Sequence, residues 1–151
     1  MLYYAMSLLG EQDSALDVLQ EVWIKTFRGI RKLKDPGSLR SWLYTITHGI
    51  AVDRIRKNYS REHAERIQLE DFEEADEPTF ADEDAAAIHE ALRQIGIKHR
   101  EVLVLHFLDD LSIAEIARVT GCSEGTVKSR IHYAKHAMKR ILREVNYGKG
   151  K

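Results

Sequence analysis

Apolar residues recur every three or four positions along most of this chain, which is the spacing of one face of an α-helix. The pattern predicts a short apolar helix from Met1 to Leu9 that ends at Gly10. Asp13 and Ser38 can cap a second and a third helix, and Asp35-Pro36-Gly37 is the turn between them. We therefore predict an all-α fold.

The second and third predicted helices each have one apolar side. The residues on these sides are Ala15, Leu19, Val22, Thr26 and Phe27 in the second helix, and Leu39, Trp42, Leu43, Ile46 and Ile50 in the third. Because Trp23 and Trp42 fall near these sides, we assign both tryptophans to core packing rather than to ligand binding.

The stretch from Leu111 to Leu142 has the pattern of a helix-turn-helix. Ser112 and Glu115 can form a capping box at the start of its first helix, in which each side chain bonds the backbone amide of the other residue. Gly121 allows a tight turn, and Ser123 is a suitable N-cap for the second helix. The buried side of that second helix is expected to comprise Val127, Ile131, Ala134, Met138 and Leu142.

The opposite side of this second helix is polar and basic. Its side chains belong to Glu124, Thr126, Lys128, Ser129, Arg130, His132 and Lys135. Groups of this kind can bind phosphates and the edges of bases. An ordinary solvated helical hairpin would show a similar pattern. We therefore use the distribution of charge along the chain to decide between nucleic-acid binding and a solvated hairpin.

Charged residues are unevenly distributed along the chain, although the formal net charge is only −1. Residues 1–61 carry 10 basic and 6 acidic groups, residues 62–90 carry 1 and 12, and residues 91–151 carry 12 and 6. Basic end segments suit a polyanion such as DNA. The acidic, weakly apolar stretch 62–84 predicts a flexible tether between two small helical domains, residues 1–61 and residues 85–151.

The cysteine content, the lengths of the apolar runs and the first residues of the sequence bear on the cellular compartment. Its single cysteine, Cys122, can form neither an internal disulfide nor a cysteine-rich zinc site, and we assign it to packing in the turn. No apolar run reaches the length of a membrane span, and the first residues do not resemble a signal peptide. We expect a cytoplasmic protein without membrane insertion.

No motif in the sequence brings catalytic residues together. The seven histidines are scattered, and His132 and His136 lie one helical turn apart without a third metal ligand nearby. There is no glycine-rich phosphate loop and no nucleophile motif. We therefore expect no enzyme activity, no bound metal and no cofactor.

Two surface features of the N-terminal part suit binding. On the second predicted helix, Asp17, Gln20 and Glu21 surround Ile24, an arrangement that fits either a protein partner or an ordinary solvated face. A basic tract with one aromatic residue follows the third helix and can hold phosphates while stacking an unpaired base. This tract comprises Asp53, Arg54, Arg56, Lys57, Asn58, Tyr59 and Arg61.

Four segments in this order resemble a bacterial sigma-70 family factor of the extracytoplasmic-function group. They are DVLQEVWIKTF, SLRSWLYTITHGIAVDRIRK, REVLVLHFLDDLSIAEIA and GTVKSRIHYAKHAMK, with the acidic linker between the second and third. The resemblance covers nearly the whole chain, from about Leu2 to Leu142. It implies two helical domains, sigma regions 2 and 4, which bind the RNA polymerase core and give it promoter selectivity.

The resemblance also implies partners for the N-terminal surfaces. The patch of Asp17, Gln20, Glu21 and Ile24 matches the family surface that docks on the clamp helices of the polymerase β′ subunit, and contacts to the β subunit are expected as well. The stretch from Tyr44 to Arg61 matches the segment that melts and reads the promoter element near −10. Asp53 and the residues after it match the position that captures a flipped base, which costs a few kcal/mol of unstacking.

In the C-terminal domain, the resemblance places side chains in the DNA major groove at the promoter element near −35, with Arg130 and Lys135 closer to phosphates. The expected contacts there are Ser123, Thr126, Lys128, Ser129, Arg130, His132, Tyr133 and Lys135. The linker matches a family segment that runs toward the RNA exit channel. An anti-sigma protein is a further expected partner, because such inhibitors commonly bind between the two domains of this family.

The sequence departs from the family pattern in three respects. Gly49 stands where the family commonly has Asn, which removes a hydrogen-bonding side chain from the middle of a helix. Tyr133 stands where Arg is usual, so a phenol replaces a charge near the −35 element. The family usually has another helix before the one that begins at Leu2, so either the sequence begins inside the domain or its first domain is abbreviated.

One alternative function remains open from the residues alone. A helix-turn-helix regulator that acts without core polymerase, such as a response-regulator output domain, would explain residues 98–145. It would require a receiver or ligand domain, and residues 1–61 lack an α/β pattern. A gel shift with and without core enzyme separates the two functions.

Overall fold

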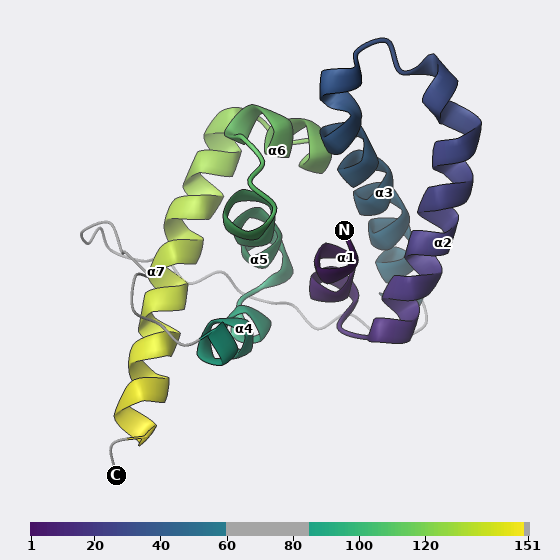
Figure 1. Cartoon of the computed structure of the whole chain (residues 1–151). Coiled ribbons are helices and arrows are strands. Elements are labelled where there is room, and N and C mark those ends of the chain that lie inside the picture. The colour runs from purple at the N-terminus through teal and green to yellow at the C-terminus, as the bar shows by residue number, and fades with distance from the viewer. Residues whose placement is uncertain (60–84, 150–151) are drawn as a thin grey trace.

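The computed structural model describes residues 1–59 and 85–149, and all regular structure in these ranges is helical (Figure 1). The N-terminal group consists of α1 (Leu2–Leu9), α2 (Gln12–Gly29), η1 (Ile30–Lys32), η2 (Pro36–Ser38) and α3 (Leu39–Tyr59). The C-terminal group consists of α4 (Ala85–Gln94), α5 (Ile97–Leu103), η3 (Val104–Leu108), α6 (Ile113–Thr120) and α7 (Glu124–Lys149). The all-α prediction is confirmed. Arg61, the side chain of Tyr59 and the linker 62–84 lie outside the described residues.

The N-terminal group is built on an antiparallel hairpin of α2 and α3, with α1 packed against both helices (Figure 1). As predicted, α1 ends at Gly10, which adopts φ 77° and donates its amide to the Met6 carbonyl. This positive φ is one that glycine adopts without steric cost. Small and β-branched residues pack between the three helices, namely Ala5, Ala15, Val18, Val22 and Ile50.

The expected cap of α2 is wrong. The helix begins at Gln12, so the N-cap position belongs to Glu11, and Asp13 lies inside the first turn. There the negative charge of Asp13 is still favourable beside the positive end of the helix dipole. The Asp35-Pro36-Gly37 turn is confirmed, because the Asp35 carboxylate accepts the Gly37 amide at 2.9 Å. Ser38 directly precedes α3, and its hydroxyl donates to the Asp35 carbonyl.

The assignment of Trp23 and Phe27 to the core is also wrong. Trp23 is 46% exposed and Phe27 is 76% exposed, and their ring centroids lie 6.4 Å apart on the surface of α2. Each follows a buried residue, Val22 or Thr26, by one position, which is a rotation of about 100° around the helix. Trp42, by contrast, is partly buried beside Gly29, where a Cβ atom would lie only 3.0 Å from its ring.

The helix-turn-helix of α6 and α7 forms as predicted. The capping box of Ser112 and Glu115 is present, and these hydrogen bonds lower the pKa of the Glu115 carboxyl. Gly121 ends α6 at φ 68°, and the Ser123 hydroxyl accepts the Thr126 amide at 3.1 Å at the start of α7. All the predicted inward residues of α7 are buried, namely Val127, Ile131, Ala134, Met138 and Leu142.

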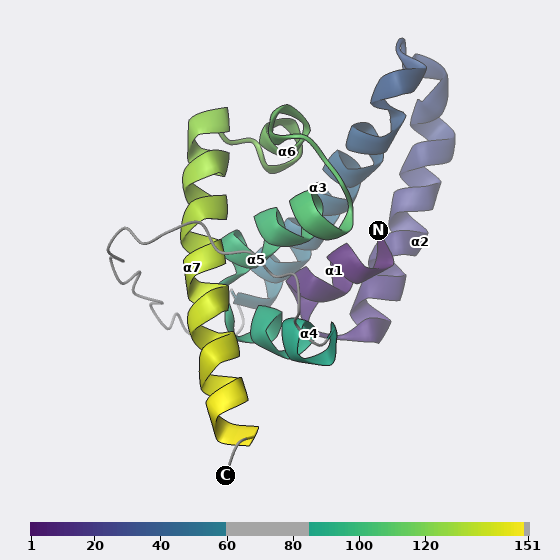
Figure 2. The same ribbon diagram turned by 60° about the vertical axis from the view of Figure 1, so that its left-hand side comes forward.

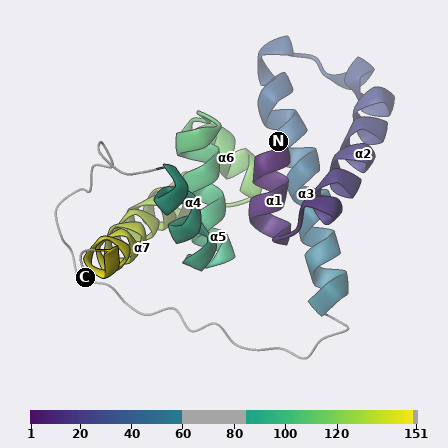
Figure 3. The same ribbon diagram turned by 60° about the horizontal axis from the view of Figure 1, so that its bottom comes forward.

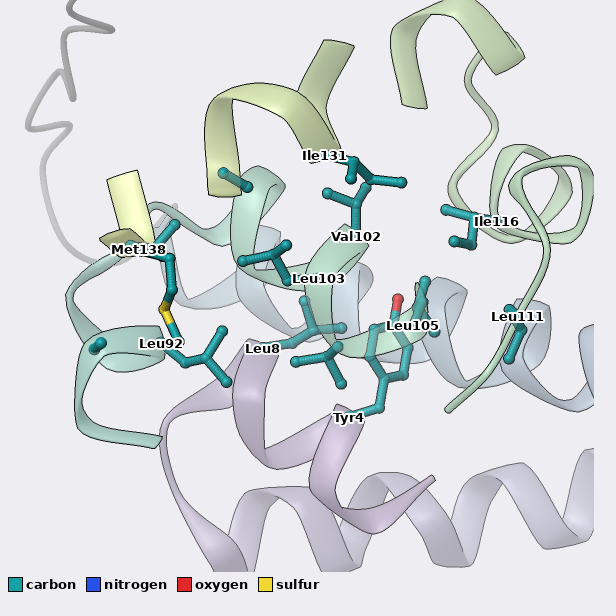
Figure 4. Packing of buried hydrophobic residues seen from close by; sticks show 14 of the residues in the cluster. Tyr4, Leu8, Leu92, Val102, Leu103, Leu105, Leu111, Ile116, Ile131 and Met138 are labelled. Carbon is teal, nitrogen blue, oxygen red and sulfur yellow. The ribbon is translucent and has the colours of Figure 1, made fainter. Parts of the chain in front are cut away.

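The N-terminal and C-terminal groups pack directly against each other, which the sequence did not predict. α1 lies against α5, and α3 lies against α6 (Figures 2 and 3). Tyr4 and Leu8 of α1 belong to the same apolar cluster as Leu103 and Leu105 (Figure 4). The largest core cluster of the described residues therefore spans both groups. None of the described helices is at once long and apolar enough to cross a membrane.

Candidate nucleic-acid and polymerase interfaces

The N-terminal half of α7 presents a compact polar surface around its first turns. Lys128 and Ser129 are exposed, and Tyr133 is 42% exposed one turn further along the helix. Ser123 and Thr126 are exposed as well, with their hydroxyl oxygens 2.9 Å apart. Because the buried side of α7 packs against α4, α5 and α6, these five residues project from a fixed scaffold.

Three other residues of the predicted −35 set are held by neighbours within the protein. Arg130 is partly buried, and its guanidinium lies 3.4 Å from the Glu101 carboxylate of α5. The ammonium of Lys135 lies 5.4 Å from the centroid of the Phe107 ring, in a cation–π contact. His132 is partly buried, with its ring centroid 4.6 Å from that of His136.

The C-terminal half of α3 presents the described part of the predicted −10 surface. Asp53, Arg56, Lys57 and Asn58 are all exposed. Arg54 differs, because its guanidinium donates to the Ser14 carbonyl at 3.2 Å and lies 3.5 Å from the Asp17 carboxylate on α2. Gly49 is exposed on α3, and a Cβ atom there would meet no neighbour within 4 Å. Nothing in the packing of α3 therefore requires glycine at this position.

The predicted core-polymerase patch lies on the outer side of α2. Asp17, Gln20, Glu21 and Ile24 are all exposed, and the Glu21 carboxylate lies 3.5 Å from the Lys25 ammonium. The structure extends this surface beyond the sequence prediction. Further large apolar side chains are exposed on α2 and η1, namely Leu16, Trp23, Phe27 and Ile30. An exposed apolar strip with a polar margin is typical of a protein-binding surface.

The connection between α2 and α3 forms a basic tip that sequence analysis missed. Between Ile24 and Leu33 the chain carries four cations and no acid, and Arg28, Arg31 and Lys32 are all exposed there. Phe27 and Ile30 are exposed at the same end of the hairpin. The signal that could have identified this tip is the run of basic residues between the aromatic Phe27 and the turn at Asp35. Such a mixture of basic and aromatic groups suits single-stranded nucleic acid.

A buried polar chain connects the two groups of helices. The Tyr4 hydroxyl lies 2.9 Å from Nδ1 of His48, which in turn lies 3.4 Å from the Glu101 carboxylate. Burial raises the pKa of the Glu101 carboxyl to about 7, although the positive charges of Arg130 and Lys98 oppose this shift. Burial also lowers the pKa of His48, and the positive charges of Arg130 and Arg56 act in the same direction, which favours the neutral imidazole beside Glu101.

The described residues offer little for metal chemistry. Within residues 1–59 and 85–149, no group of three or more His, Cys, Asp or Glu side chains is arranged to hold a metal ion. Cys122 is partly buried in the turn before α7, with its sulfur 3.7 Å from the Thr120 carbonyl oxygen.

A helix-turn-helix with a polar outward surface, joined to a three-helix unit with a basic surface, defines a helical nucleic-acid-binding protein. Residues 1–61 match the family model for sigma-70 region 2, and residues 85–138 match that for sigma-70 region 4. The chain belongs to the sigma-70 family and is an extracytoplasmic-function sigma factor, a non-catalytic protein that directs RNA polymerase to promoters.

Two curated relatives carry the same assignment. The chain is 31% identical over 135 residues to the RNA polymerase sigma factor SigV of Bacillus subtilis, covering 89% of this chain and 80% of the relative. It is 32% identical over 148 residues to the ECF RNA polymerase sigma factor SigL of Mycobacterium tuberculosis, covering 94% of this chain and 82% of the relative.

The fold agrees with a solved structure. The sigma factor RpoE of Bartonella quintana, crystallised with the anti-sigma factor NepR, superposes with a TM-score of 0.73 at 22% sequence identity. The match covers 93% of this chain and 88% of the RpoE chain, so it includes both helical groups.

Proposed function

We propose that residues 1–61 act as region 2, which docks on core polymerase and opens DNA near −10, and that residues 85–151 act as region 4, which reads the element near −35. Residues 62–84 act as the linker between them. The observation that carries this proposal is that one scaffold exposes three surfaces of different chemistry. They are an apolar and acidic surface on α2, a basic surface on α3 and a polar surface on α7.

The α2 surface suits the β′ clamp helices, because Ile24 and the acidic and amide groups around it are all accessible. Exposed Trp23 and Phe27 enlarge the apolar area that a partner helix can cover. Aromatic residues are the side chains that most often dominate binding energy at interfaces. We therefore include both aromatic residues in the core-polymerase surface, with contacts to the β subunit as a further component of the same complex.

At the −10 element, the contacts come from Asp53, Arg56, Lys57 and Asn58 on α3, followed by Tyr59 and Arg61. The exposed basic groups offset the phosphate charge of the separated strand. Arg54 differs from the rest of this set, because its contacts with Ser14 and Asp17 make it a brace between α2 and α3. The basic tip around Arg31 offers additional phosphate contacts.

At the −35 element, Lys128, Ser129 and Tyr133 read base edges, because they project from the exposed side of α7. Ser123 and Thr126 contact the backbone at the N-terminus of this helix, where amide groups favour phosphate. His132 packs beside Tyr133 and orients it. Lys135 and Arg130 reach phosphates only after they leave Phe107 and Glu101, respectively.

Partners and location follow from the same assignment. The protein acts in the cytoplasm, where RNA polymerase is, and it requires no cofactor. An anti-sigma protein is a further partner. The solved sigma factor that shares this fold was crystallised with such an inhibitor, which supports this proposal.

The decisive experiment is transcription in vitro with core polymerase and this chain on a random promoter library. Selected start sites that share two sequence elements about two DNA turns apart are the expected result. Core polymerase whose start-site choice is unchanged by the protein would contradict the proposal. Gel shifts with and without core polymerase then show whether the chain instead binds duplex DNA by itself, as an independent regulator would.

A further inference from the structure

The recognition helix α7 continues well beyond the residues that we propose to read the −35 element. It runs from Glu124 to Lys149, and Figure 2 shows it as one continuous helix along the edge of the C-terminal group. The proposed base-reading residues end at Tyr133. Because an α-helix rises about 1.5 Å per residue, Arg143 lies about 15 Å further along the axis than Tyr133. The chemistry of this second half of α7 is not used by the proposed function.

Basic side chains follow one side of α7 through both halves. Lys128, His132, Lys135, Lys139 and Arg143 are three or four positions apart, which is the spacing of one helix face. Lys128 and Arg143 are exposed, and the other three are partly buried. Between Lys128 and Arg143 the sequence contains no aspartate or glutamate. These five residues form a basic stripe that begins on the −35 surface and continues past it.

The far end of the basic stripe has little negative charge of its own nearby. Lys139 follows Lys135 by four positions and precedes Arg143 by four, and like charges at this spacing destabilise a helix. In the part of the chain that the structure describes, neither Lys139 nor Arg143 forms an ion pair. Glu144 lies about 100° around the helix from Arg143. A row of cations of this kind favours a polyanion as its partner.

Duplex DNA beside the −35 element is the polyanion within reach of the basic stripe. The major groove is about 12 Å wide, so a helix that crosses it leaves the base edges and meets the phosphates at the border of the groove. The N-terminus of α7 is the end that enters the groove, and Lys139 and Arg143 are therefore on the end that leaves it. An acidic protein surface would satisfy the same charges. The continuity of the basic stripe with the DNA-reading residues favours DNA.

We propose that Lys139 and Arg143 make a second DNA contact, to phosphates of the duplex that flanks the −35 element where α7 leaves the major groove. The proposal rests on the function proposed above, because it takes α7 to lie in the groove near −35. Both residues lie beyond Met138, the last residue matched by the family model for region 4. Phosphate contacts carry no direct sequence information and fix register and orientation. This contact therefore adds affinity at every promoter and orients α7.

The first test measures how the binding of labelled −35 duplex by the full chain depends on salt. Lys139→Gln with Arg143→Gln should reduce the slope of log affinity against log salt by about 1.8. Between roughly 50 and 200 mM salt, wild type should then lose about ten times more affinity than this variant. Lys139→Arg with Arg143→Lys keeps both charges and should keep the wild-type slope.

A matched control removes two cations from another face of the same domain. Arg93 on α4 and Lys98 on α5 are both exposed. Arg93→Gln with Lys98→Gln changes the net charge by the same amount and should keep the wild-type slope. Circular dichroism verifies that each variant keeps its helices.

The second test varies the length of the DNA. One duplex ends at the −35 element, and two others carry about 8 further base pairs, roughly 27 Å, on one side or the other. Wild type should bind one of the two extended duplexes several-fold more tightly than the short one. Changing the sequence of that flank should not alter the gain. The variant with Lys139→Gln and Arg143→Gln should bind the short and extended duplexes equally.

Two results would overturn the second DNA contact. They are equal salt slopes for wild type and the Lys139→Gln, Arg143→Gln variant, and a gain from the flank that this variant retains. A variant that binds DNA like wild type but binds core polymerase more weakly would instead assign the basic stripe to an acidic protein surface. A chain that shows the flank-dependent contact but never redirects core polymerase would contradict the proposed function alone.

Discussion

Arg54 of α3 and Asp17 of α2 contact each other, with guanidinium and carboxylate 3.5 Å apart. From the sequence they belong to different surfaces, one for promoter DNA and one for core polymerase. The structure shows that they are neighbours on one side of the hairpin, where Arg54 also donates to the Ser14 carbonyl. The surfaces proposed for polymerase and for DNA are therefore adjacent, and a substitution at Asp17 also removes one of the two contacts that hold Arg54.

Combining Asp17→Ala with Gln20→Ala should weaken core-polymerase binding about tenfold, because truncation of central interface residues commonly costs 1–2 kcal/mol. Both side chains are exposed, so helicity and melting temperature should remain close to wild type. Fluorescence anisotropy with purified core polymerase measures the affinity. Asp13→Ala, an exposed change one turn earlier on α2, is the control. Equal affinities for all these proteins would mean that the patch is only a solvated face.

Lys128→Ala should reduce promoter use in a sequence-dependent way. Lys128 is exposed on the recognition helix, and loss of a base contact costs about 1–3 kcal/mol on promoters that carry the recognised base. Lys135→Ala should instead weaken all promoters about equally and reduce the salt dependence by about one counterion. Binding measured on a panel of −35 variants at several salt concentrations separates the two cases. Uniform losses for Lys128→Ala would place that residue on a phosphate.

Tyr133→Arg should change the preferred sequence near −35 and leave the preference near −10 unaltered. Tyr133 is exposed beside His132, and a guanidinium there can bond two acceptors on a guanine where the phenol offers one donor. Transcription profiling of the promoter library with both proteins measures the two preferences. If neither Tyr133→Arg nor Lys128→Ala alters the −35 preference, the placement of α7 in the major groove is wrong.

Replacement of Glu101 by Gln should remove one component of the pH dependence of stability. Because burial raises the folded-state pKa of Glu101 from 4.5 to about 7, its protonated carboxyl favours the folded chain. This contribution is complete below about pH 4.5 and is lost as pH rises through about 7. Relative to wild type, the Glu101→Gln protein should therefore gain up to about 3 kcal/mol across this range, at 1.36 kcal/mol per pKa unit.

Urea denaturation of both proteins between pH 4.5 and pH 8 measures this difference. His48 and His99 have pKa values lowered by burial, so their contributions change in the opposite direction with pH. They are present in both proteins and largely cancel in the comparison. Glu90→Gln, at an exposed position, should keep the wild-type pH dependence. Parallel curves for wild type and Glu101→Gln would show that Glu101 titrates as an ordinary exposed carboxyl.

The helix-turn-helix could be predicted from sequence because its signals are local. The capping box of Ser112 and Glu115, the glycine at position 121 and the cap at Ser123 each involve residues within three or four positions. Trp23 and Phe27 could not be placed, because α2 has apolar residues on more than one side and periodicity does not tell which side meets α3. The exposed patch of Asp17, Gln20, Glu21 and Ile24 was predicted as a surface, and its partner remains a proposal.

Contacts between distant residues were beyond the reach of sequence patterns. Glu101 lies in a strongly apolar stretch, and its partners Arg130 and His48 are 29 and 53 positions away. The prediction that Arg130 contacts a phosphate considered only the helix that carries Arg130. It therefore missed the contact of Arg130 with Glu101 on α5. Likewise, the periodicity of α1 indicated an apolar helix but not that Tyr4 and Leu8 would pack against the second domain.

The shared apolar cluster makes the free sigma factor one cooperative folding unit. A cavity created near Val102 would weaken the packing of α1, and a cavity near Leu8 would weaken the packing of α5, because both residues belong to the same cluster. Heat should therefore unfold both domains in a single transition. Proteases that cut only opened chains should therefore attack both domains together, at a rate set by how often the whole unit opens.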